Sequence, residues 1–362
     1  MISGPYGAGN YGDDVLGRII CDQLSARGAS VLVAADNPGD AAEYFGDKYE
    51  LRPRLNLRGR KFNFFKDIRR LDMFVVGGGE QMYEPRFPNP IYGHLATNLQ
   101  ATLAATKMGK RAACLAVGVD DRLSRLGKLT ASAILSKATF LGVRDVASGN
   151  RLRALVRKST EVHVGADPAF LLAQSQPLSC ASDSKAGNRS VLITPSVDKR
   201  HSMAFIPALN KLTYELTASG YSVIYACSDL QPSYDRVLFD EKLLDLPAGA
   251  SWLSPDESTI ETYLNLVKSV DCVVSSRMHP LIFALALNKP IVCISRAAKM
   301  EALMESLNLD FQSIETLVTE RLISSVWRCL EQDQSITSPA EVQLMIERAS
   351  TQFDAFARAM SA

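Results

Sequence analysis

The chain has 362 residues, of which 47% are hydrophobic and 22% charged, and its net charge is +1. This composition is ordinary for a globular protein and leaves room for about two domains of ~150 residues. The balanced charge argues against nucleic-acid binding, and the lack of an unbroken apolar run of about 18 residues argues against a membrane span. Met1–Pro5 has neither the basic nor the apolar region of a signal peptide, so we expect a cytoplasmic protein.

The seven cysteines form no CxxC pair, and Cys114 and Cys272 lie, like Cys293, inside apolar runs. We therefore expect reduced core thiols rather than a disulfide framework. No histidine shows metal-ligand spacing with carboxylates or thiols, so the sequence predicts no metal site.

Short apolar runs alternate with amphipathic stretches in the first half of the chain, which predicts a parallel sheet covered by helices. The predicted strands are Met1–Ser3, Ser30–Ala35, Met73–Val76, Ala112–Val119, Phe140–Val143 and Val162–Val164. The pattern breaks at residues 174–189, which are rich in Ser, Pro, Gly and Asn, as linkers are.

A second alternating series follows. Its predicted strands are Ser190–Thr194, Ser222–Cys227, Cys272–Ser275 and Ile291–Ile294. Its predicted helices include Ala204–Ser219, Ser258–Val267, Pro280–Leu287 and a final helix at Ala340–Ala359. The fold class is therefore α/β, with two Rossmann-like domains and a cleft between them, where ligands usually bind. The predicted boundaries are 1–175 for the first domain, 176–189 for the linker, 190–335 for the second domain, and 336–362 for a helix that packs back on the body.

Gly7-Ala8-Gly9-Asn10-Tyr11-Gly12 stands between a predicted strand and a predicted helix, and Asp36 ends the next strand 24 residues after Gly12. This is the spacing of a dinucleotide fingerprint. Asp13 and Asp14 follow at once, however, and would repel a pyrophosphate. A tight turn is a second interpretation. We prefer a third, a sugar site in which Asn10 and Asp13 bond to hydroxyls and Tyr11 stacks.

Gly77-Gly78-Gly79-Glu80 follows another predicted strand. Three glycines allow either a close backbone approach to a ligand or a flexible turn, and the sequence leaves both open. Arg144 ends a further strand, where its guanidinium could grip an anion, and Asp145 could cap the next helix.

Ser275-Ser276-Arg277-Met278-His279-Pro280 joins a predicted strand to a predicted helix. Pro280 suits the first helical position, which puts His279 at the helix cap. The unbonded N–H groups and the dipole there favour an anion. Arg277, His279 and the helix end therefore predict an anion site with a titratable group, which suits a phosphorylated or carboxylated substrate. Lys299 follows the next strand at the same edge of the sheet.

Five segments carry a resemblance to the polysaccharide pyruvyl transferase family, in the family's order, along about residues 2–310. They are Gly7–Asp14, Gly77–Gly79, Gly142–Asp145, Asp167–Phe170 and Ser276–His279 with its apolar helix. The chain has Met278 and Pro280 where the family commonly has leucine and a residue other than proline.

The resemblance implies a fold like that of GT-B glycosyltransferases and a transferase of cell-envelope or exopolysaccharide biosynthesis. It implies phosphoenolpyruvate as donor and a sugar of a glycan or lipid-linked precursor as acceptor. The domain 1–175 would then be the acceptor side and the domain 190–335 the donor side. The product would be a pyruvate ketal, with release of phosphate and no cofactor. It also implies that His279, Arg144 and Lys299 act in donor binding or catalysis.

The predicted site follows from this chemistry. His279 moves protons, and Asp13 is the second catalytic candidate, as a base that activates a hydroxyl. The carboxylate and phosphate of the donor need several cationic or N–H groups. The donor-binding candidates are Arg144, Arg277, Lys299 and Ser276, and the acceptor-binding candidates are Asn10, Tyr11, Gly78, Gly79 and Glu80.

Three alternatives stay open. A GT-B glycosyltransferase that uses a nucleotide sugar would need an acidic ribose clamp, for which Glu257 and Glu261 are candidates. A dinucleotide-dependent oxidoreductase would use Gly7–Gly12 and Asp36. A carbohydrate-binding protein without activity would not need His279.

A lipid-linked acceptor would bring the protein to the cytoplasmic face of the inner membrane. The basic stretches Arg52–Lys61 and Lys66–Arg70 fit such a peripheral contact, and they fit solvated loops equally well. We expect no nucleic acid as a partner, and the sequence leaves a homo-oligomer open.

Overall fold

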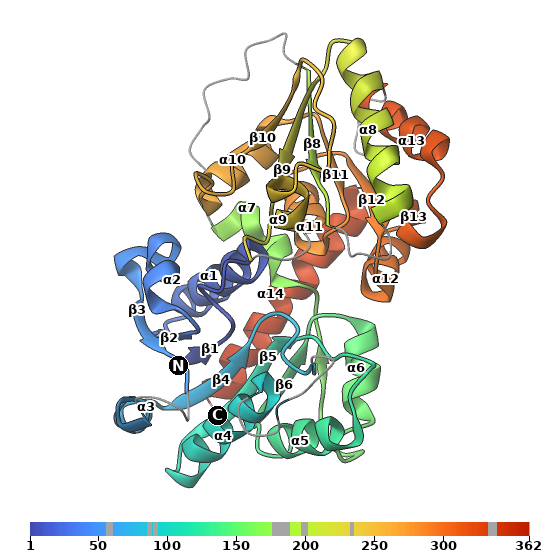
Figure 1. The fold of residues 1–362 in the computed structure, drawn as a ribbon. Coiled ribbons are helices and arrows are strands. Elements are labelled where there is room, and N and C mark those ends of the chain that lie inside the picture. Colours follow the sequence, from blue (N-terminus) through green and yellow to red (C-terminus); the bar gives the residue numbers. More distant parts are fainter. Residues whose placement is uncertain are drawn as a thin grey trace. The chain divides into compact units, whose positions relative to one another are not determined.

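The computed structural model describes residues 1–55, 61–84, 89, 93–175, 189–196, 202–231, 235–331 and 339–361. The predicted linker at 176–189 thus lies outside the described residues, apart from Arg189. The chain forms two compact units, each built on its own parallel sheet (Figure 1). Unit 1 comprises Met1–Ala8, Asp13–Leu171 and Met345–Ala362, and unit 2 comprises Gly9–Gly12 and Leu172–Leu344. The prediction of an α/β fold with two parallel-sheet domains is confirmed.

The sheet of unit 1 has the order β3-β2-β1-β4-β5-β6-β7. Its strands are β1 (Ile2–Ser3), β2 (Leu32–Ala35), β3 (Glu50–Pro53), β4 (Met73–Gly77), β5 (Arg111–Val117), β6 (Phe140–Val143) and β7 (His163–Val164). The short β1 is central, because Ile2 pairs with Val33 on one side and Val75 on the other. The strand order therefore reverses between β1 and β4, and at such a switch point open α/β sheets bind ligands.

Helices cover both faces of this sheet. They are α1 (Tyr11–Ala26), α2 (Pro38–Phe45), α3 (Lys61–Arg69), α4 (His94–Lys107), α5 (Arg125–Leu135) and α6 (Val146–Arg153). Because parallel crossovers are right-handed, α1 and α2 lie on one face and α3, α4 and α5 on the other (Figure 1). The second face has a continuous apolar core, in which Phe64, Leu95 and Ile134 pack beneath the strands.

The sheet of unit 2 has the order β10-β9-β8-β11-β12-β13 and reverses between β8 and β11. Its strands are β8 (Ser190–Thr194), β9 (Ser222–Ala226), β10 (Ala250–Leu253), β11 (Cys272–Ser275), β12 (Ile291–Ser295) and β13 (Phe311–Ser313). Its helices are α7 (Leu172–Ser175), α8 (Ser202–Ala218), α9 (Asp235–Asp240), α10 (Ile260–Ser269), α11 (Met278–Ala286), α12 (Ala298–Ser306) and α13 (Thr319–Glu331). Leu209, Leu212 and Val326 bring α8 and α13 into one core with the strands.

The last helix, α14 (Pro339–Ser361), contributes its residues from Met345 onward to unit 1. Gln352 Nε2 donates to the carbonyls of Val143 (2.8 Å) and His163 (3.1 Å), and the ring of Phe356 packs edge-on against Phe140 at 5.1 Å. The end of the chain thus covers β6 and β7. In the described part of the chain, no helix has the length and apolar character needed to cross a bilayer.

Candidate active site

The loop after β11 holds the residues that the sequence analysis singled out in unit 2. Helix α11 begins at Met278 with Arg277 as N-cap, so His279 is its second residue and Pro280 its third. The prediction of Pro280 at the first position is therefore wrong by two residues. Proline is still tolerated there, because the first N–H groups of a helix have no partner within it. His279 lies in the first turn, and its ring stacks on Phe283 with the centroids 6.1 Å apart.

The guanidinium of Arg277 is held by two carboxylates. Its Nε and Nη2 donate to Asp235 Oδ1 at 2.9 and 2.7 Å, and Nη2 also donates to Asp229 Oδ2 at 3.2 Å. Burial alone would lower the pKa of Arg277, but Asp235 and Asp229 raise it. The same burial raises the pKa of Asp229 against the influence of Arg277. The positive charge of Arg277 is thus largely matched within the protein, and the sequence analysis missed both aspartates.

The glycine turn packs against this loop. Leu230 N–H donates to Gly9 O (2.7 Å), and Asn10 forms an antiparallel bridge with Asp229, which itself holds Arg277. A Cβ on Gly12 would fall 2.6 Å from Cγ of His279 and nearer still to Nδ1. The structure therefore brings Asn10 and Gly12 to the Arg277–His279 segment.

Tyr11 is buried in the same turn. Its hydroxyl donates to Ser258 O at 2.6 Å, and its ring lies 5.5 Å from that of Tyr263. These contacts fasten the turn to the loop before α10 and to α10. They favour a supporting role for Tyr11 over the predicted stacking on a sugar.

Ser276 and Lys299 are placed differently. Ser276 is buried, and its hydroxyl accepts from Ser196 N–H (2.6 Å) and donates to Ser196 O (3.0 Å), which ties the ends of β8 and β11 together. Lys299 is exposed in the first turn of α12, after the carboxyl end of β12. Arg296, which the sequence analysis did not select, follows β12 directly and donates to the hydroxyl of Ser196.

Unit 1 holds a second cluster of predicted site residues, at the point between β1 and β4 where its strand order reverses. Gly78 and Gly79 follow β4 with φ of +71° and +72°, a left-handed conformation that favours glycine. A Cβ on Gly79 would lie 3.1 Å from Asp13 Oδ1. The triple glycine is therefore an ordered turn that brings its backbone close to Asp13.

Arg144 lies in the same cluster and is buried. Its Nη1 donates to Asp167 Oδ2 at 3.2 Å, and burial, which would lower its pKa, is outweighed by Asp167, Glu80, Asp145 and Asp13, which raise it. The predicted residues Asp13, Gly79, Glu80 and Arg144 are thus neighbours in unit 1. Asp145 caps α6 through Ser148 N–H (2.6 Å), which confirms that prediction.

Asp14, beside Asp13, is a buried carboxyl with a displaced pKa. Burial raises its pKa to about 7, helped by Asp13 and Asp40 and opposed by the bond from Gly7 N–H at 2.6 Å. In the sequence, Asp14 is recognisable only as a charge at the helix start. Its burial could not be seen there, because it depends on where the glycine turn folds.

A buried polar network adjoins the triple glycine and was also missed. Arg54 donates to Asp36 (3.0 Å) and to Asn98 (2.9 Å), so Asp36, the acid of the dinucleotide-fingerprint spacing, is paired with a cation. The ring of His94 contacts Arg54 and Gln81, and burial together with Arg54 lowers its pKa well below the usual range. Gln81 Nε2 donates to Gly78 O at 2.5 Å, so this network supports the glycine turn.

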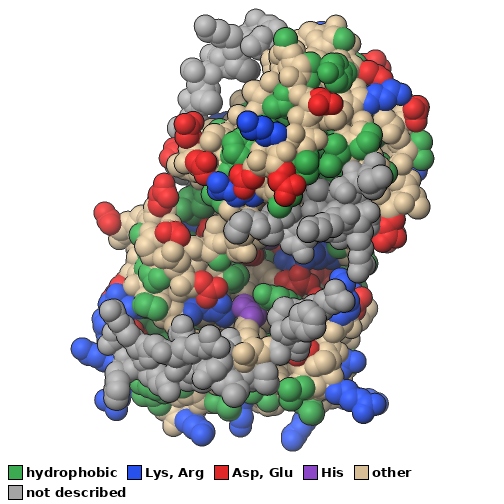
Figure 2. Space-filling model, in the orientation of Figure 1, with side chains coloured by type: hydrophobic (Ala, Val, Ile, Leu, Met, Phe, Trp, Pro, Cys, Tyr) green, Lys and Arg blue, Asp and Glu red, His purple; other side chains and the backbone are tan. Residues whose placement is uncertain are grey.

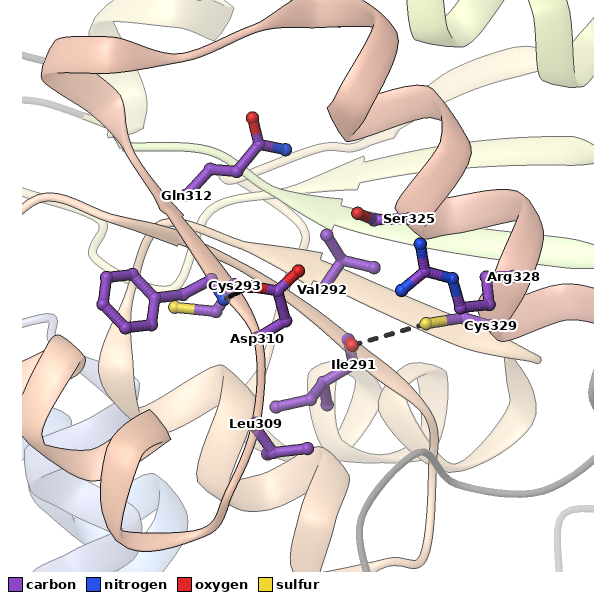
Figure 3. Close-up of a pocket in the computed structure, with 10 residues that line it drawn as sticks. Ile291, Val292, Cys293, Leu309, Asp310, Gln312, Ser325, Arg328 and Cys329 are labelled. Atoms are coloured by element: carbon purple, nitrogen blue, oxygen red, sulfur yellow. Dashed lines mark hydrogen bonds between the residues drawn. The ribbon is translucent and has the colours of Figure 1, made fainter.

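A cavity of about 40 Å³ lies elsewhere in unit 2, between β12, β13 and α13 (Figure 3). Cys329 Sγ donates to Ile291 O there at 3.5 Å, and Arg328 lines the same space. The volume suits a few water molecules and not a substrate, and no predicted site residue lines it. Among the described residues, no cluster of His, Cys, Asp and Glu fits a metal ion, and the six cysteines are buried and free of disulfides.

Solved structures share this fold across the whole chain. UDP-GlcNAc 2-epimerase of Methanocaldococcus jannaschii, in complex with UDP-GlcNAc and UDP, has a TM-score of 0.63 and 13% identity, covering 100% of this chain and 99% of its own. Anabaena Alr3699/HepE, in complex with UDP-glucose, has a TM-score of 0.58 and 13% identity, covering 99% and 97%. The spinosyn rhamnosyltransferase SpnG has a TM-score of 0.51 and 13% identity, covering 99% and 98%. The protein thus has the GT-B fold of such epimerases and glycosyltransferases.

A sequence model of the polysaccharide pyruvyl transferase family matches residues 10–297. This range is most of the chain and includes Arg144 and His279, while Lys299 lies just beyond it. The chain belongs to the polysaccharide pyruvyl transferase family, whose members are transferases acting on polysaccharide. A search of curated proteins found no match.

Proposed function

We propose that the chain transfers pyruvate from phosphoenolpyruvate to a sugar of a glycan or lipid-linked glycan precursor and forms a pyruvate ketal. The observation that carries the proposal is the family match over residues 10–297, which contains His279 in the first turn of α11. An N–H-rich helix start next to an imidazole suits a donor with two acidic groups whose reaction moves protons.

The proposed reaction balances without a cofactor. One sugar hydroxyl adds across the enol double bond: its oxygen bonds to C2 of the donor, and a proton goes to the methylene carbon. Phosphate then leaves C2 with its electron pair, the oxygen of a second hydroxyl bonds to C2, and the proton of that hydroxyl passes through the proton-transfer group to the departing phosphate. His279 is the proposed proton-transfer group, and Asp13 is the proposed base for a hydroxyl.

The proposed roles of the remaining site residues follow from the contacts that each makes in the structure. Lys299 is exposed beyond β12 and is the proposed contact for an acidic group of the donor. Arg144 stands among carboxylates, and Arg277 is paired with Asp229 and Asp235. We propose that both arginines bind the donor, and that each gives up some of its hydrogen bonds to these carboxylates when the donor binds. Asn10, Glu80 and the backbone of Gly78 and Gly79 stay the predicted acceptor contacts.

A nucleotide-sugar glycosyltransferase is the second candidate, because similar structures are complexes with UDP-GlcNAc and UDP-glucose. Its predicted ribose clamp, Glu257 and Glu261, consists of two exposed residues around the start of α10. The oxidoreductase has less support, because Asp36 is engaged by Arg54. A homo-oligomer and a cytoplasmic location stay predictions.

Product analysis tests the proposal. The protein is incubated with phosphoenolpyruvate and a panel of short glycosides, and mass spectrometry looks for addition of pyruvate minus water, in step with phosphate release. His279→Ala should lower the rate by ~10²–10⁴-fold, as loss of general acid–base catalysis does. His163→Gln, a half-buried histidine in β7, is the matched control and should keep the rate.

Two results would contradict the proposal. One is release of nucleoside diphosphate from a nucleotide sugar with no change in phosphoenolpyruvate. The other is an unchanged rate of ketal formation in a folded His279→Ala variant, which would remove His279 from catalysis.

A further inference from the structure

The outer surface of α3, α4 and α5, which cover one face of the unit 1 sheet, has an uneven charge. The described side chains of these helices include five exposed cations and one carboxylate, Asp67, which is buried. The cations are Lys66, Arg69, Lys107, Arg125 and Lys128. Figure 2 shows Lys and Arg side chains projecting along the edge that these helices form. In a chain with a net charge of +1, positive charge is therefore concentrated on one surface.

Large apolar side chains stand between these cations. Phe65 of α3 is 40% exposed, and Leu126 and Leu129 of α5 are 56% and 69% exposed. On α5 they alternate with Arg125 and Lys128, and Thr130 is the next residue. Apolar side chains flanked by Lys and Arg are the pattern of helices that lie in the headgroup region of a bilayer.

Only part of the two basic stretches that the sequence suggested for membrane contact, Arg52–Lys61 and Lys66–Arg70, lies on this surface. Arg54 is buried in its contacts with Asp36 and Asn98, and Arg52 pairs with Glu50 and Asp67, so the described part of Arg52–Lys61 offers little free charge. Residues 56–60 lie outside the described residues. From Lys66–Arg70, the side chains of Lys66, Arg69 and Arg70 are exposed.

Acids do lie near this surface: Asp72 is exposed just after α3, and Glu84 accepts from Ser124 N–H at the start of α5 at 2.7 Å. At the start of α5, Arg122 pairs with Asp120 and Asp121 at 3.8 and 3.6 Å, which leaves the cations of α5 itself outside those pairs. Each Lys or Arg near an anionic membrane contributes roughly a fivefold gain in partitioning. The two leucines add apolar burial that a purely electrostatic partner would not use.

We propose that the surface formed by α3, α4 and α5 docks peripherally on an anionic lipid bilayer, with Leu126 and Leu129 entering the headgroup region. The bilayer is favoured over an acidic protein because the exposed Leu126 and Leu129 stand among the cations of α5, where an electrostatic partner would not use them. The inference does not depend on which reaction the chain catalyses, and its test uses no substrate.

Vesicle flotation tests the docking. The full-length protein is mixed with vesicles of phosphatidylcholine alone, or of three parts phosphatidylcholine to one part phosphatidylglycerol. Binding should be confined to the anionic vesicles and should weaken as salt is raised, because salt screens the cations. The double variant Arg125→Gln/Lys128→Gln should bind ~30-fold more weakly. Leu126→Ser/Leu129→Ser should bind ~10-fold more weakly while keeping the salt dependence.

The matched control changes one exposed cation and one exposed apolar residue of unit 2, Lys242→Gln and Val318→Ser. It should bind like the unchanged protein. The proposal is overturned by equal binding to neutral and anionic vesicles, by no binding to either, or by α5 variants that match the control. Circular dichroism confirms that each variant is folded before it is compared.

Discussion

Gly12 occupies the second position of α1 with an ordinary helical φ, where alanine would normally be the more stable residue by up to about 1 kcal/mol. The neighbouring imidazole is the reason for glycine, because a Cβ would fall 2.6 Å from Cγ and 2.9 Å from Cβ of His279. Part of the glycine motif thus serves to let His279 lie against the turn. This role differs from the phosphate cradle that the spacing predicts.

A double-mutant cycle tests this role. Gly12→Ala should destabilise the protein by about 1–3 kcal/mol, as overpacking does. In a His279→Ala background the loss should be clearly smaller, because the ring atoms are gone and only the contact with Cβ at 2.9 Å remains. Denaturant unfolding of the four proteins gives the coupling energy. Equal losses in both backgrounds would show that the imidazole is not what requires glycine.

Asp14 gives the protein a pH dependence of known sign. Burial raises its pKa in the folded state to about 7, from an ordinary value of 3.8. Between these values the folded state binds more protons than the unfolded state, so this group makes stability fall as pH rises from about 4 to about 7. Asp14→Asn keeps an acceptor for Gly7 N–H and removes the titration.

The variant should therefore gain stability relative to the unchanged protein as pH rises from 5 to 8, by roughly 1–3 kcal/mol. Unfolding free energies at both pH values measure this. Glu43→Gln, an exposed carboxyl of α2, is the control and should follow the unchanged protein. A constant difference between Asp14→Asn and the unchanged protein across this range would contradict the assignment.

For single residues, contacts with near neighbours in the chain could be predicted from the sequence, whereas contacts with residues far along the chain could not. Asp145 could be predicted as a helix cap, because a cap bonds within three residues. The carboxylates that hold Arg277 are 42 and 48 residues away in the chain, and no local pattern marks them. Arg54 likewise stands in a basic stretch that reads as a surface loop, but it is buried by contacts with Asn98 and Ser3.

Among the elements, the strands that the sequence analysis missed all lie at sheet edges. They are β3 (Glu50–Pro53), β10 (Ala250–Leu253) and β13 (Phe311–Ser313). Central strands such as β11 are buried on both faces and read as apolar runs. Edge strands tolerate charge and proline, as Glu50 and Pro53 show, because they need only one neighbour.

The first residue of a helix was predicted less accurately than the presence of the helix itself. The predicted helix Pro280–Leu287 is observed as Met278–Ala286, and Ser258–Val267 as Ile260–Ser269. The apolar period fixes which face of a helix is buried, but the first turn is decided by the loop before it. Ser275 Oγ accepts from Arg277 N–H at 2.9 Å and so sets where α11 begins.

On the scale of the whole molecule, two separate cores make the units distinguishable in unfolding. Both tryptophans, Trp252 and Trp327, lie in unit 2, so their fluorescence reports that unit, whereas far-ultraviolet circular dichroism reports both. Phe356 is fully buried in the part of α14 that belongs to unit 1.

Phe356→Ala should cost unit 1 about 3–5 kcal/mol and shift the transition seen by circular dichroism. The tryptophan transition should stay in place. Phe205→Ala, in the core of unit 2, is the matched variant and should shift the tryptophan transition. A common shift of both signals in either variant would mean that the two units unfold as one cooperative body.

The sequence by itself determined the alternation of strands and helices, the two parallel sheets, the family, and the positions of Gly77–Gly79, Arg144 and His279 next to strand ends. These features are local, since periodicity, turn residues and caps act over a few residues. Only the tertiary structure decided that Asp229 and Asp235 hold Arg277, that Gly12 makes room for His279, and that Asp14 is buried. Those facts depend on which strands become neighbours, and the burial and pairing of charges follow from that choice.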